Sequence, residues 1–421
     1  MQNNFRFDLS NYLIHFFRDV DLESNAYIHF PEFAGFNNIY EDTKLSALFL
    51  LRCALRHSKL IASWSYRNNK RSVYGYNPAV CFTEMPLAAF VQTSFERLQR
   101  GENINQYALL LPKSNMFSLG ARPVIYALTS NSISYVKTNN SEERIIDPNQ
   151  LPILEQYRYV TYNPSSKYPI DWTHEREWRW ACRNDLTEYN KELYEDGILE
   201  DFSKLPSLDI KNSNITGAGV VVPKNKDVEK VLFDILTLID KGDVLHNTFN
   251  FILSTENLNF TQIINPLDLE KFINENLIDV SSFYQMNDDI QANINKDINN
   301  IISNGISSIS QKAENYQNEQ GKSWVWIIDN QSEVARALIL SKRITINIEG
   351  KYLLEIKNIE NKTLREQEAI CKNIASQISN KYSINCNYFS TLNTFDPDWV
   401  PFYSDFDDTY HSYYNVSRQD S

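Results

Sequence analysis

The chain has 421 residues, of which 42% are hydrophobic and 13% aromatic, and its formal net charge at pH 7 is -12. A chain of this length and composition can bury a sizeable core, and its length favours two or three domains. The five cysteines are widely spread and form no CxxC pair, so neither a disulfide framework nor a structural zinc site is expected.

No apolar run approaches the roughly 20 residues that span a bilayer, and the N-terminal sequence MQNNFRFDLS lacks a basic region followed by an apolar core. We therefore expect a cytoplasmic protein with no membrane partner. Lys and Arg slightly outnumber Asp and Glu up to Arg183, whereas the remainder of the chain is strongly acidic. This division permits an anionic ligand in the N-terminal part of an acidic protein.

The first part of the chain predicts an α+β domain in which strands dominate. A helix is expected within residues 41–60, with Asp42 and Thr43 as candidate caps. Regular alternation of strands and helices is missing, which argues against a doubly wound parallel sheet. Short apolar strands are expected at residues 11–17, 79–83, 107–112, 123–128, 133–138, 157–163, 177–183 and 217–223.

Residues 226–320 follow a helical period and are predicted to be mostly helical. From residue 321 the pattern changes to strand, helix, hairpin, helix and strand, which is typical of a small α+β module. We therefore expect three domains, at residues 1–225, 226–320 and 321–421. The acidic stretch 185–214 is expected to be a surface insertion.

The segment THEREWRWACR, residues 173–183, places two glutamates two positions apart. Alternate side chains of a strand share a face, so Glu175, Glu177 and Arg179 would lie on one side and Trp178 and Trp180 on the other. An isolated pattern of this kind is more often a solvated sheet face with cross-strand ion pairs. The nearby tryptophans favour a cleft instead, because apolar surroundings strengthen the interactions of a carboxylate.

The segment AVCFTEMPLAAF, residues 79–90, runs from an apolar strand into Thr83 and Glu84 and then into a proline that can open a helix. The Thr83 hydroxyl is placed to bond a ligand or the adjacent backbone, and capping of the helix is an equal alternative. His15 lies in the first strand, where a lone histidine is more often a core residue than a ligand-binding one.

The loop at residues 63–78 places Arg67, Lys70 and Arg71 among four aromatic side chains. This combination suits a nucleotide or single-stranded nucleic acid, because cations neutralise phosphate and aromatic faces stack on bases. A charged surface loop has the same composition. Arg122 precedes a proline and a predicted strand, where it could lie at the edge of a cleft. Motifs of the common nucleotide-binding, hydrolase and metalloprotease classes are absent from the sequence.

The order of these segments resembles a loosely characterised bacterial family. LIHF, LSALFLLRCALRHSKLIAS, AVCFTEMPLAAF, YALLLPKSNMFSLGARPVIY and DWTHEREWRW are similar in layout to abortive-infection proteins of the AbiG type and uncharacterised relatives, over roughly residues 11–225. The histidine strand, the strand-end threonine and the late glutamate also resemble the three-motif plan of NAD-dependent ADP-ribosyltransferases, including DarT-type toxins. The chain departs from this plan where Phe16 and Phe17 follow His15 in place of a threonine.

The resemblance implies an N-terminal ADP-ribosyltransferase-like domain of two packed antiparallel sheets with few helices, and NAD as the cofactor. It also implies that His15 contacts the adenosine ribose, that Thr83 orders the nicotinamide-ribose site and that Glu177 is the catalytic carboxylate. Glu175 would be its partner in the E-x-E pair. Cleavage of the nicotinamide bond develops positive charge on the ribose, which a fixed carboxylate stabilises.

Phe82, Arg67 and Arg122 would complete the cofactor site. Arginines of the loop at residues 67–71, with Arg122 or Arg176, would hold the pyrophosphate, and no metal is expected. The implied function is a toxin or effector that ADP-ribosylates RNA or DNA in anti-phage defence or a toxin–antitoxin system, with an antitoxin or chaperone as partner. Protein arginine is an alternative acceptor. A non-enzymatic abortive-infection sensor or antitoxin is a second class of function, and a metal-dependent nuclease that uses Glu84, Glu175 and Glu177 is a third.

Overall fold

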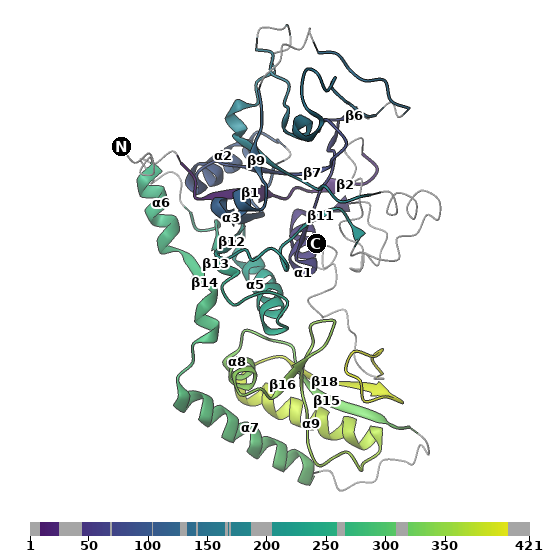
Figure 1. Ribbon diagram of the computed structural model, residues 1–421. Coiled ribbons are helices and arrows are strands. Elements are labelled where there is room, and N and C mark those ends of the chain that lie inside the picture. Colours follow the sequence, from purple (N-terminus) through teal and green to yellow (C-terminus); the bar gives the residue numbers. More distant parts are fainter. Residues whose placement is uncertain are drawn as a thin grey trace. The chain divides into compact units, whose positions relative to one another are not determined.

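A computed structural model of the protein (Figure 1) describes residues 9–24, 44–67, 70–102, 104–126, 133–139, 142–164, 167, 170–186, 204–258, 266–308 and 319–402. The chain divides into two compact units. Unit 1 comprises Met1–Val231, Leu245–Asp279 and Asn415–Ser421, and unit 2 comprises Leu232–Val244 and Val280–Tyr414. Residues 226–320, expected to form a helical region, therefore contribute to both units. Across the described residues, no helix has the length and apolar composition needed to cross a bilayer.

Unit 1 is organised around one eight-stranded mixed sheet. In spatial order its strands are β14 (Leu277–Asp279), β13 (Phe249–Ser254), β12 (Ala218–Val222), β8 (Ala108–Pro112), β1 (Tyr12–Phe16), β7 (Ala79–Thr83), β10 (Glu177–Ala181) and β9 (Arg122–Pro123). The pair β12 and β13 is parallel, and the other neighbours are antiparallel. The predicted α+β class is confirmed. The predicted pair of packed antiparallel sheets is wrong, because β1 pairs with strands on both sides and joins them into a single sheet.

Both faces of this sheet are buried. Helices α2 (Leu87–Gln99) and α6 (Pro266–Glu275) cover one face, where they pack against Ile14 of β1 and Leu110 of β8. The neighbouring Leu109, whose side chain points to the other face, is also fully buried. Burial on both faces explains why these strands appear in the sequence as continuous apolar runs.

Local signals determine where the helices of unit 1 begin. Helix α1 (Ala47–His57) starts at Ser46, whose side chain accepts a hydrogen bond from the Phe49 amide at 3.2 Å. Ser46 therefore takes the capping position expected for Asp42 or Thr43, which lie outside the described residues. The expected helix after Pro86 is α2. The remaining elements are β2 (Val20–Asp21), β3 (Lys44–Leu45), β4 (Lys59–Ile61), β5 (Tyr66–Arg67), β6 (Lys70–Arg71), α3 (Lys113–Ser118), β11 (Ser207–Asp209) and two 3-10 helices (Ile153–Arg158 and Thr173–Glu175).

Three predicted strands, at residues 123–128, 133–138 and 157–163, do not form continuous strands in their described parts. After β9, the described residues of these segments form isolated bridges: Ile125 with Tyr159, Tyr135 with Ile146 and Asn163 with Ile170. The carbonyls of Tyr157 and Tyr159 accept hydrogen bonds from the Arg179 side chain. These carbonyls are therefore satisfied by a guanidinium and not by a neighbouring strand. Most of the predicted insertion at 185–214 lies outside the described residues.

Unit 2 contains a four-stranded antiparallel sheet with helices on one face. Its strands, in spatial order, are β16 (Ile344–Ile346), β17 (Tyr352–Leu354), β15 (Gly321–Ile327) and β18 (Cys386–Leu392). The cover consists of α7 (Asp288–Ser308), α8 (Glu333–Leu340) and α9 (Leu364–Tyr382). A capping box between Thr363 and Glu366 begins α9. From residue 321 onward, this is the element order that the sequence predicts.

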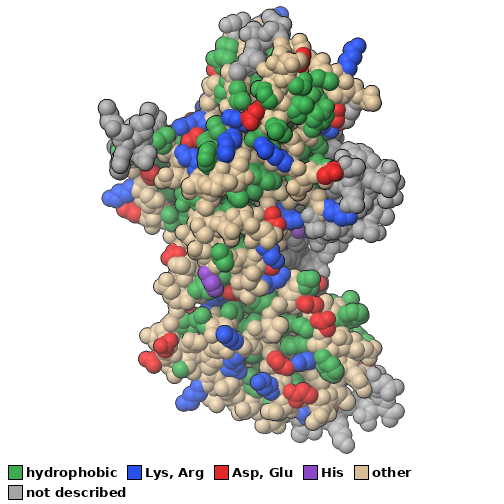
Figure 2. Space-filling model, in the orientation of Figure 1, with side chains coloured by type: hydrophobic (Ala, Val, Ile, Leu, Met, Phe, Trp, Pro, Cys, Tyr) green, Lys and Arg blue, Asp and Glu red, His purple; other side chains and the backbone are tan. Residues whose placement is uncertain are grey.

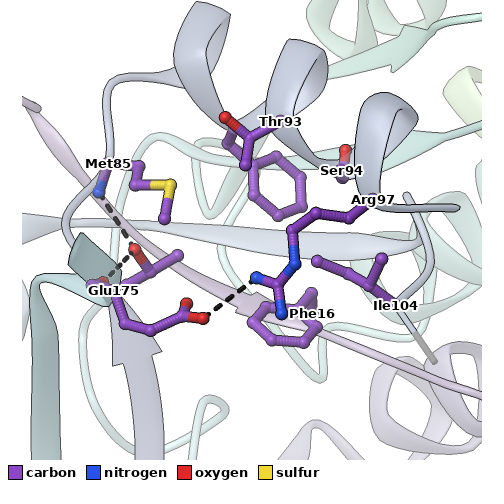
Figure 3. A pocket seen from close by; sticks show the side chains of 9 residues that line it. Phe16, Met85, Thr93, Ser94, Arg97, Ile104 and Glu175 are labelled. Carbon is purple, nitrogen blue, oxygen red and sulfur yellow. Dashed lines mark hydrogen bonds and ion pairs between the residues drawn. The ribbon is translucent and has the colours of Figure 1, made fainter. Parts of the chain in front are cut away.

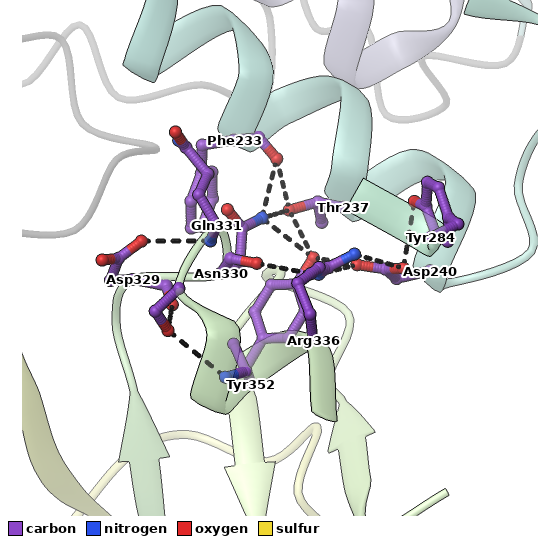
Figure 4. Close-up of polar contacts among 11 residues, drawn as sticks. Phe233, Thr237, Asp240, Tyr284, Asp329, Asn330, Gln331, Arg336 and Tyr352 are labelled. Atoms are coloured by element: carbon purple, nitrogen blue, oxygen red, sulfur yellow. Dashed lines mark hydrogen bonds and ion pairs between the residues drawn. The ribbon is translucent and has the colours of Figure 1, made fainter. Parts of the chain in front are cut away.

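A buried polar cluster connects α8 and β17 to the end of α5 (Asn225–Asp240), as Figure 4 shows. Arg336 donates from Nη2 to Asp240 Oδ2 at 2.6 Å, and the Tyr352 hydroxyl donates to the same oxygen at 2.9 Å. Asn330 Nδ2 donates to the Tyr352 hydroxyl at 2.9 Å. The Arg336 and Asp240 side chains are 4% and 1% exposed, so each charge depends on the other for compensation.

Arg336→Met would leave Asp240 buried without its ion partner. We expect this change to lower the free energy of unfolding of unit 2 by about 3–5 kcal/mol. Lys381→Met, which removes a solvent-exposed pair with Asp297, should leave the free energy of unfolding nearly unchanged. Hydrogen-exchange mass spectrometry of peptides from α8 and β17, with α2 as internal reference, measures both effects. Equal protection in the two variants would contradict the importance of the buried pair.

Candidate functional site

A cleft of about 800 Å3 lies in unit 1 beside β1, β7 and β10. Its volume is within the range of small-molecule and cofactor sites. Five of the predicted catalytic and cofactor-binding residues line it: His15, Phe82, Thr83, Glu175 and Glu177.

The register of three neighbouring strands brings these residues together. Ile14 pairs with Thr83 between β1 and β7, and Glu177 pairs with Thr83 between β7 and β10. Within the described residues, Ile14 and Thr83 are the only registered pair of β1 and β7. One residue further along β1, His15 Nδ1 donates to the Cys81 carbonyl at 2.9 Å. The His15 side chain thus takes the place of a backbone hydrogen bond between β1 and β7, where the cleft begins.

His15 forms the polar part of an aromatic end of the cleft. Its ring lies edge-on to Phe17 and Phe82, with centroid distances of 5.0 and 5.8 Å. Burial lowers the pKa of His15, and the hydrogen bond to the Cys81 carbonyl opposes that effect. Because a carbonyl can only accept, the proton is assigned to Nδ1, and Nε2 of the neutral ring remains an acceptor.

Glu177 is oriented by a buried arginine. Arg179 Nε donates to Glu177 Oε1 at 2.7 Å, and Arg179 Nη1 donates to the carbonyls of Tyr157 and Tyr159 at 2.6 and 3.4 Å. Burial alone would lower the pKa of Arg179, but the charge and hydrogen bond of Glu177, together with Cys81 and Tyr126, outweigh burial and raise the pKa. The Glu177 side chain is 19% exposed, so the carboxylate is fixed by Arg179 and still reaches the cleft.

Two further groups lie close to the charge of Glu177. Burial, with repulsion by Glu177 added to it, raises the pKa of the Cys81 thiol to about 12. The same two causes raise the pKa of Tyr126 to about 12. The Tyr126 hydroxyl donates to the Trp172 carbonyl at 2.8 Å. Neither the thiol nor the phenol ionises at neutral pH.

The expectation that Glu175 and Glu177 share one strand face is wrong. Glu175 ends the 3-10 helix Thr173–Glu175, and Arg176 adopts a left-handed conformation with φ of 47° before β10 begins. Alternation of side chains holds only within a strand, so it does not reach back to Glu175. Both glutamates nevertheless line the cleft.

Glu175 is held by contacts to α2 and β7 (Figure 3). Arg97 Nη1 donates to Glu175 Oε1 at 2.9 Å. The Thr83 hydroxyl donates to the Glu175 carbonyl at 2.6 Å and accepts a hydrogen bond from the Met85 amide at 3.2 Å. The Thr83 hydroxyl is therefore bonded to the adjacent backbone, as one of its expected roles requires.

The tryptophans of β10 do not border Glu177 as expected. Trp178 and Trp180 project from the opposite side of the strand, where Trp178 Nε1 donates to Glu84 Oε2 at 2.8 Å. Lys113 Nζ donates to the other Glu84 oxygen at 2.8 Å, and Glu84 does not line the cleft. The indole that does line it belongs to Trp172.

Arg67 and Arg122 are the two arginines predicted for the cofactor site, and of these only Arg122 has a described side chain. Arg122 packs over the Phe117 ring at 4.0 Å and donates to the Phe117 carbonyl at 2.7 Å, and it is not among the residues that line the cleft. Arg67 belongs to β5, but its side chain lies outside the described part of the chain.

On the face drawn in Figure 2, Lys and Arg side chains gather over α2, α3 and β9.

A second aromatic wall joins Tyr74, from the loop at residues 63–78 that the sequence singles out, to residues that no motif indicates. The Arg144 guanidinium lies 3.9 Å from the centroid of the Tyr74 ring, and Tyr135 stacks near the same ring at 6.5 Å and 18°. Lys70 also lines the cleft. Tyr135 and Arg144 come from an irregular segment without a recognisable motif. Arg97, on a surface-type helix, gave no sequence signal either.

Comparison with known proteins assigns no function to this cleft. Residues 287–416, nearly all of them in unit 2, match a family model described as a protein of unknown function, DUF4427. No curated protein and no solved structure matches the chain. Within the described residues, no group of three or more His, Cys, Asp or Glu side chains is arranged to hold a metal ion.

Glu177→Gln should make the Cys81 thiol more reactive. Removing a neighbouring negative charge favours the thiolate, so the pKa of Cys81 falls from about 12 and its fraction ionised at mildly alkaline pH rises. Peptide mass spectrometry after timed iodoacetamide treatment measures the rate. Cys386, whose pKa burial also raises to about 12, lies in unit 2 and serves as the internal control. An unchanged Cys81 rate would show that Glu177 does not point toward this thiol.

Proposed function

We propose that the cleft of unit 1 binds NAD and that Glu177 promotes cleavage of the bond between nicotinamide and ribose. One observation carries this proposal. His15, Thr83 and Glu177 come from segments far apart in the sequence, yet they lie on adjacent strands and line one cleft. This is the grouping of residues that the resemblance to ADP-ribosyltransferases implies.

The chemistry requires a fixed negative charge beside the ribose. The bond from the ribose C1' to the nicotinamide nitrogen breaks, its electron pair leaves with nicotinamide, and C1' becomes positive. Glu177, oriented by Arg179, stabilises this charge as it develops. C1' then bonds to a nucleophilic oxygen or nitrogen of the acceptor, whose proton passes to a base. Glu175 is the proposed base, held in place by Arg97.

The side chains at the His15 end of the cleft suit the adenosine half of NAD. Nε2 of the neutral His15 ring can accept from a ribose hydroxyl, and Phe17 and Phe82 offer apolar surface to a base. Arg18 lines the same cleft and supplies a cation for the pyrophosphate. Because the Thr83 hydroxyl is already bonded to backbone, its role in this proposal is to position Glu175 and the end of β7.

The proposed setting is that of a toxin or effector in anti-phage defence or a toxin–antitoxin system, with a cognate antitoxin or chaperone. Nucleic acid is the proposed acceptor, and protein arginine is the alternative. A metal-dependent nuclease is a weaker candidate, because Glu84 is engaged by Lys113 and Trp178 and does not line the cleft. A non-enzymatic sensor or antitoxin has no need of a carboxylate fixed in this way.

Glu177→Gln keeps the shape of the side chain and removes its charge. We expect the release of nicotinamide from NAD by the full-length protein to fall roughly 100- to 1000-fold, because the variant lacks one electrostatic interaction with the transition state. Chromatography of the free base measures the rate.

Glu96→Gln is the matched control, since it makes the same change on an exposed part of α2. Equal nicotinamide release by wild type and Glu177→Gln would refute the role of Glu177. Cleavage of nucleic acid that requires a divalent metal and leaves NAD intact would favour the nuclease.

A further inference from the structure

The cleft carries excess positive charge in an acidic protein. Among the described residues, its charged lining side chains are Arg18, Lys70, Arg97, Arg144, Arg179, Glu175 and Glu177. Both carboxylates are paired with arginines of this set. Five cations against two carboxylates give this described lining an excess of positive charge, although the net charge of the chain is -12. A concave positive site of this kind concentrates anionic ligands.

One of these cations, Arg144, belongs to an accessible aromatic wall, and Lys70 lines the same cleft next to Arg71, whose carbonyl accepts a hydrogen bond from Arg144 Nη1 at 3.0 Å. Tyr74 is the centre of the wall, with the Arg144 guanidinium at 3.9 Å on its ring and Tyr135 stacked nearby. The Tyr135 side chain is 52% exposed. The ion pairs of the described residues include neither Lys70 nor Arg144, whose guanidinium bonds to a neutral carbonyl instead. Both cations are therefore available to an anion.

The wall and the His15 end are each connected to Glu177 by a short series of contacts. The Tyr74 ring meets the Tyr159 ring edge-on at 4.9 Å, and the Tyr159 carbonyl accepts from Arg179, the partner of Glu177. His15 bonds to the Cys81 carbonyl, and Glu177 is close enough to Cys81 to raise the pKa of its thiol. Both parts of the cleft are thus linked to the carboxylate at which the proposed reaction joins a donor and an acceptor.

We propose that the wall of Tyr74, Tyr135, Arg144 and Lys70 binds the acceptor, and that this acceptor is single-stranded nucleic acid. The inference rests on the proposed function, because it assigns the second substrate of the same reaction. An unpaired base stacks on the exposed Tyr135 ring, and the flanking phosphates contact Lys70 and Arg144. A base inside a duplex is stacked on its neighbours and cannot reach a recessed wall. An acceptor arginine would bring its guanidinium toward two like charges.

Fluorescence anisotropy of short labelled single-stranded RNA and DNA oligonucleotides tests this assignment. The binding protein is the full-length Glu177→Gln variant without NAD, so that no transfer occurs. Added Tyr135→Ala should weaken binding about tenfold, and Tyr135→Phe should retain it because the ring remains. Lys70→Glu should weaken binding and reduce the slope of log affinity against log salt by about 0.7, the value for a single phosphate.

Two control variants make the same kinds of substitution, loss of an exposed ring and reversal of a charge, at positions outside the wall. Phe117→Ala removes a ring that, like that of Tyr135, is 52% exposed but is outside the cleft. Lys224→Glu makes the same charge change at another exposed position of unit 1. Both controls should bind the oligonucleotides as the parent variant does.

The assignment is overturned if Tyr135→Ala and Phe117→Ala bind equally, if duplexes bind as tightly as single strands, or if labelled ADP-ribose passes to protein arginine. It is also overturned if wild type releases nicotinamide but no oligonucleotide binds, and in that case the proposed function survives. Oligonucleotide binding through Tyr135 without any release of nicotinamide would refute the proposed function and with it the acceptor role.

Discussion

The pairing of Glu177 with Arg179 is the interaction on which the cleft of unit 1 depends. Arg179 is 5% exposed, and a guanidinium so far from water requires both an anion and further acceptors. Glu177 supplies the anion, and the carbonyls of Tyr157 and Tyr159 supply the acceptors. The arginine therefore fixes the carboxylate in one direction and ties an irregular segment to β10. Without it, neither the position of Glu177 nor the wall next to Tyr159 would be defined.

The cleft beside Glu177 opens where the backbone pairing between β1 and β7 ends. A sheet with a continuous ladder would close this region, but His15 uses its side chain to satisfy the Cys81 carbonyl. The imidazole thus compensates a backbone group and presents Nε2 to the cleft at the same time. The cations that line the cleft contrast with the net negative charge of the chain. They attract an anionic ligand to the cleft and also bind it there.

The sequence predicted those parts of the structure that depend on local patterns. Apolar strands with a polar residue near their ends identified His15, Thr83 and Glu177, and the capping residues at Thr363 and Glu366 agree with the predicted helix of unit 2. It could not predict contacts made between distant segments, such as those of Arg97 and Arg144. The prediction that Glu175 shares a strand face with Glu177 was wrong because Arg176, between them, has a positive φ, which is uncommon for a residue other than glycine.

The most direct measurement is a crystal structure of the full-length Glu177→Gln protein grown with NAD. We expect the dinucleotide to occupy the cleft of unit 1, with its adenosine beside His15 and Phe82 and the hydroxyls of its nicotinamide ribose within hydrogen-bond distance of the side chain at position 177. NAD bound outside this cleft, or a cleft that stays empty when NAD is saturating, would contradict the proposed chemistry.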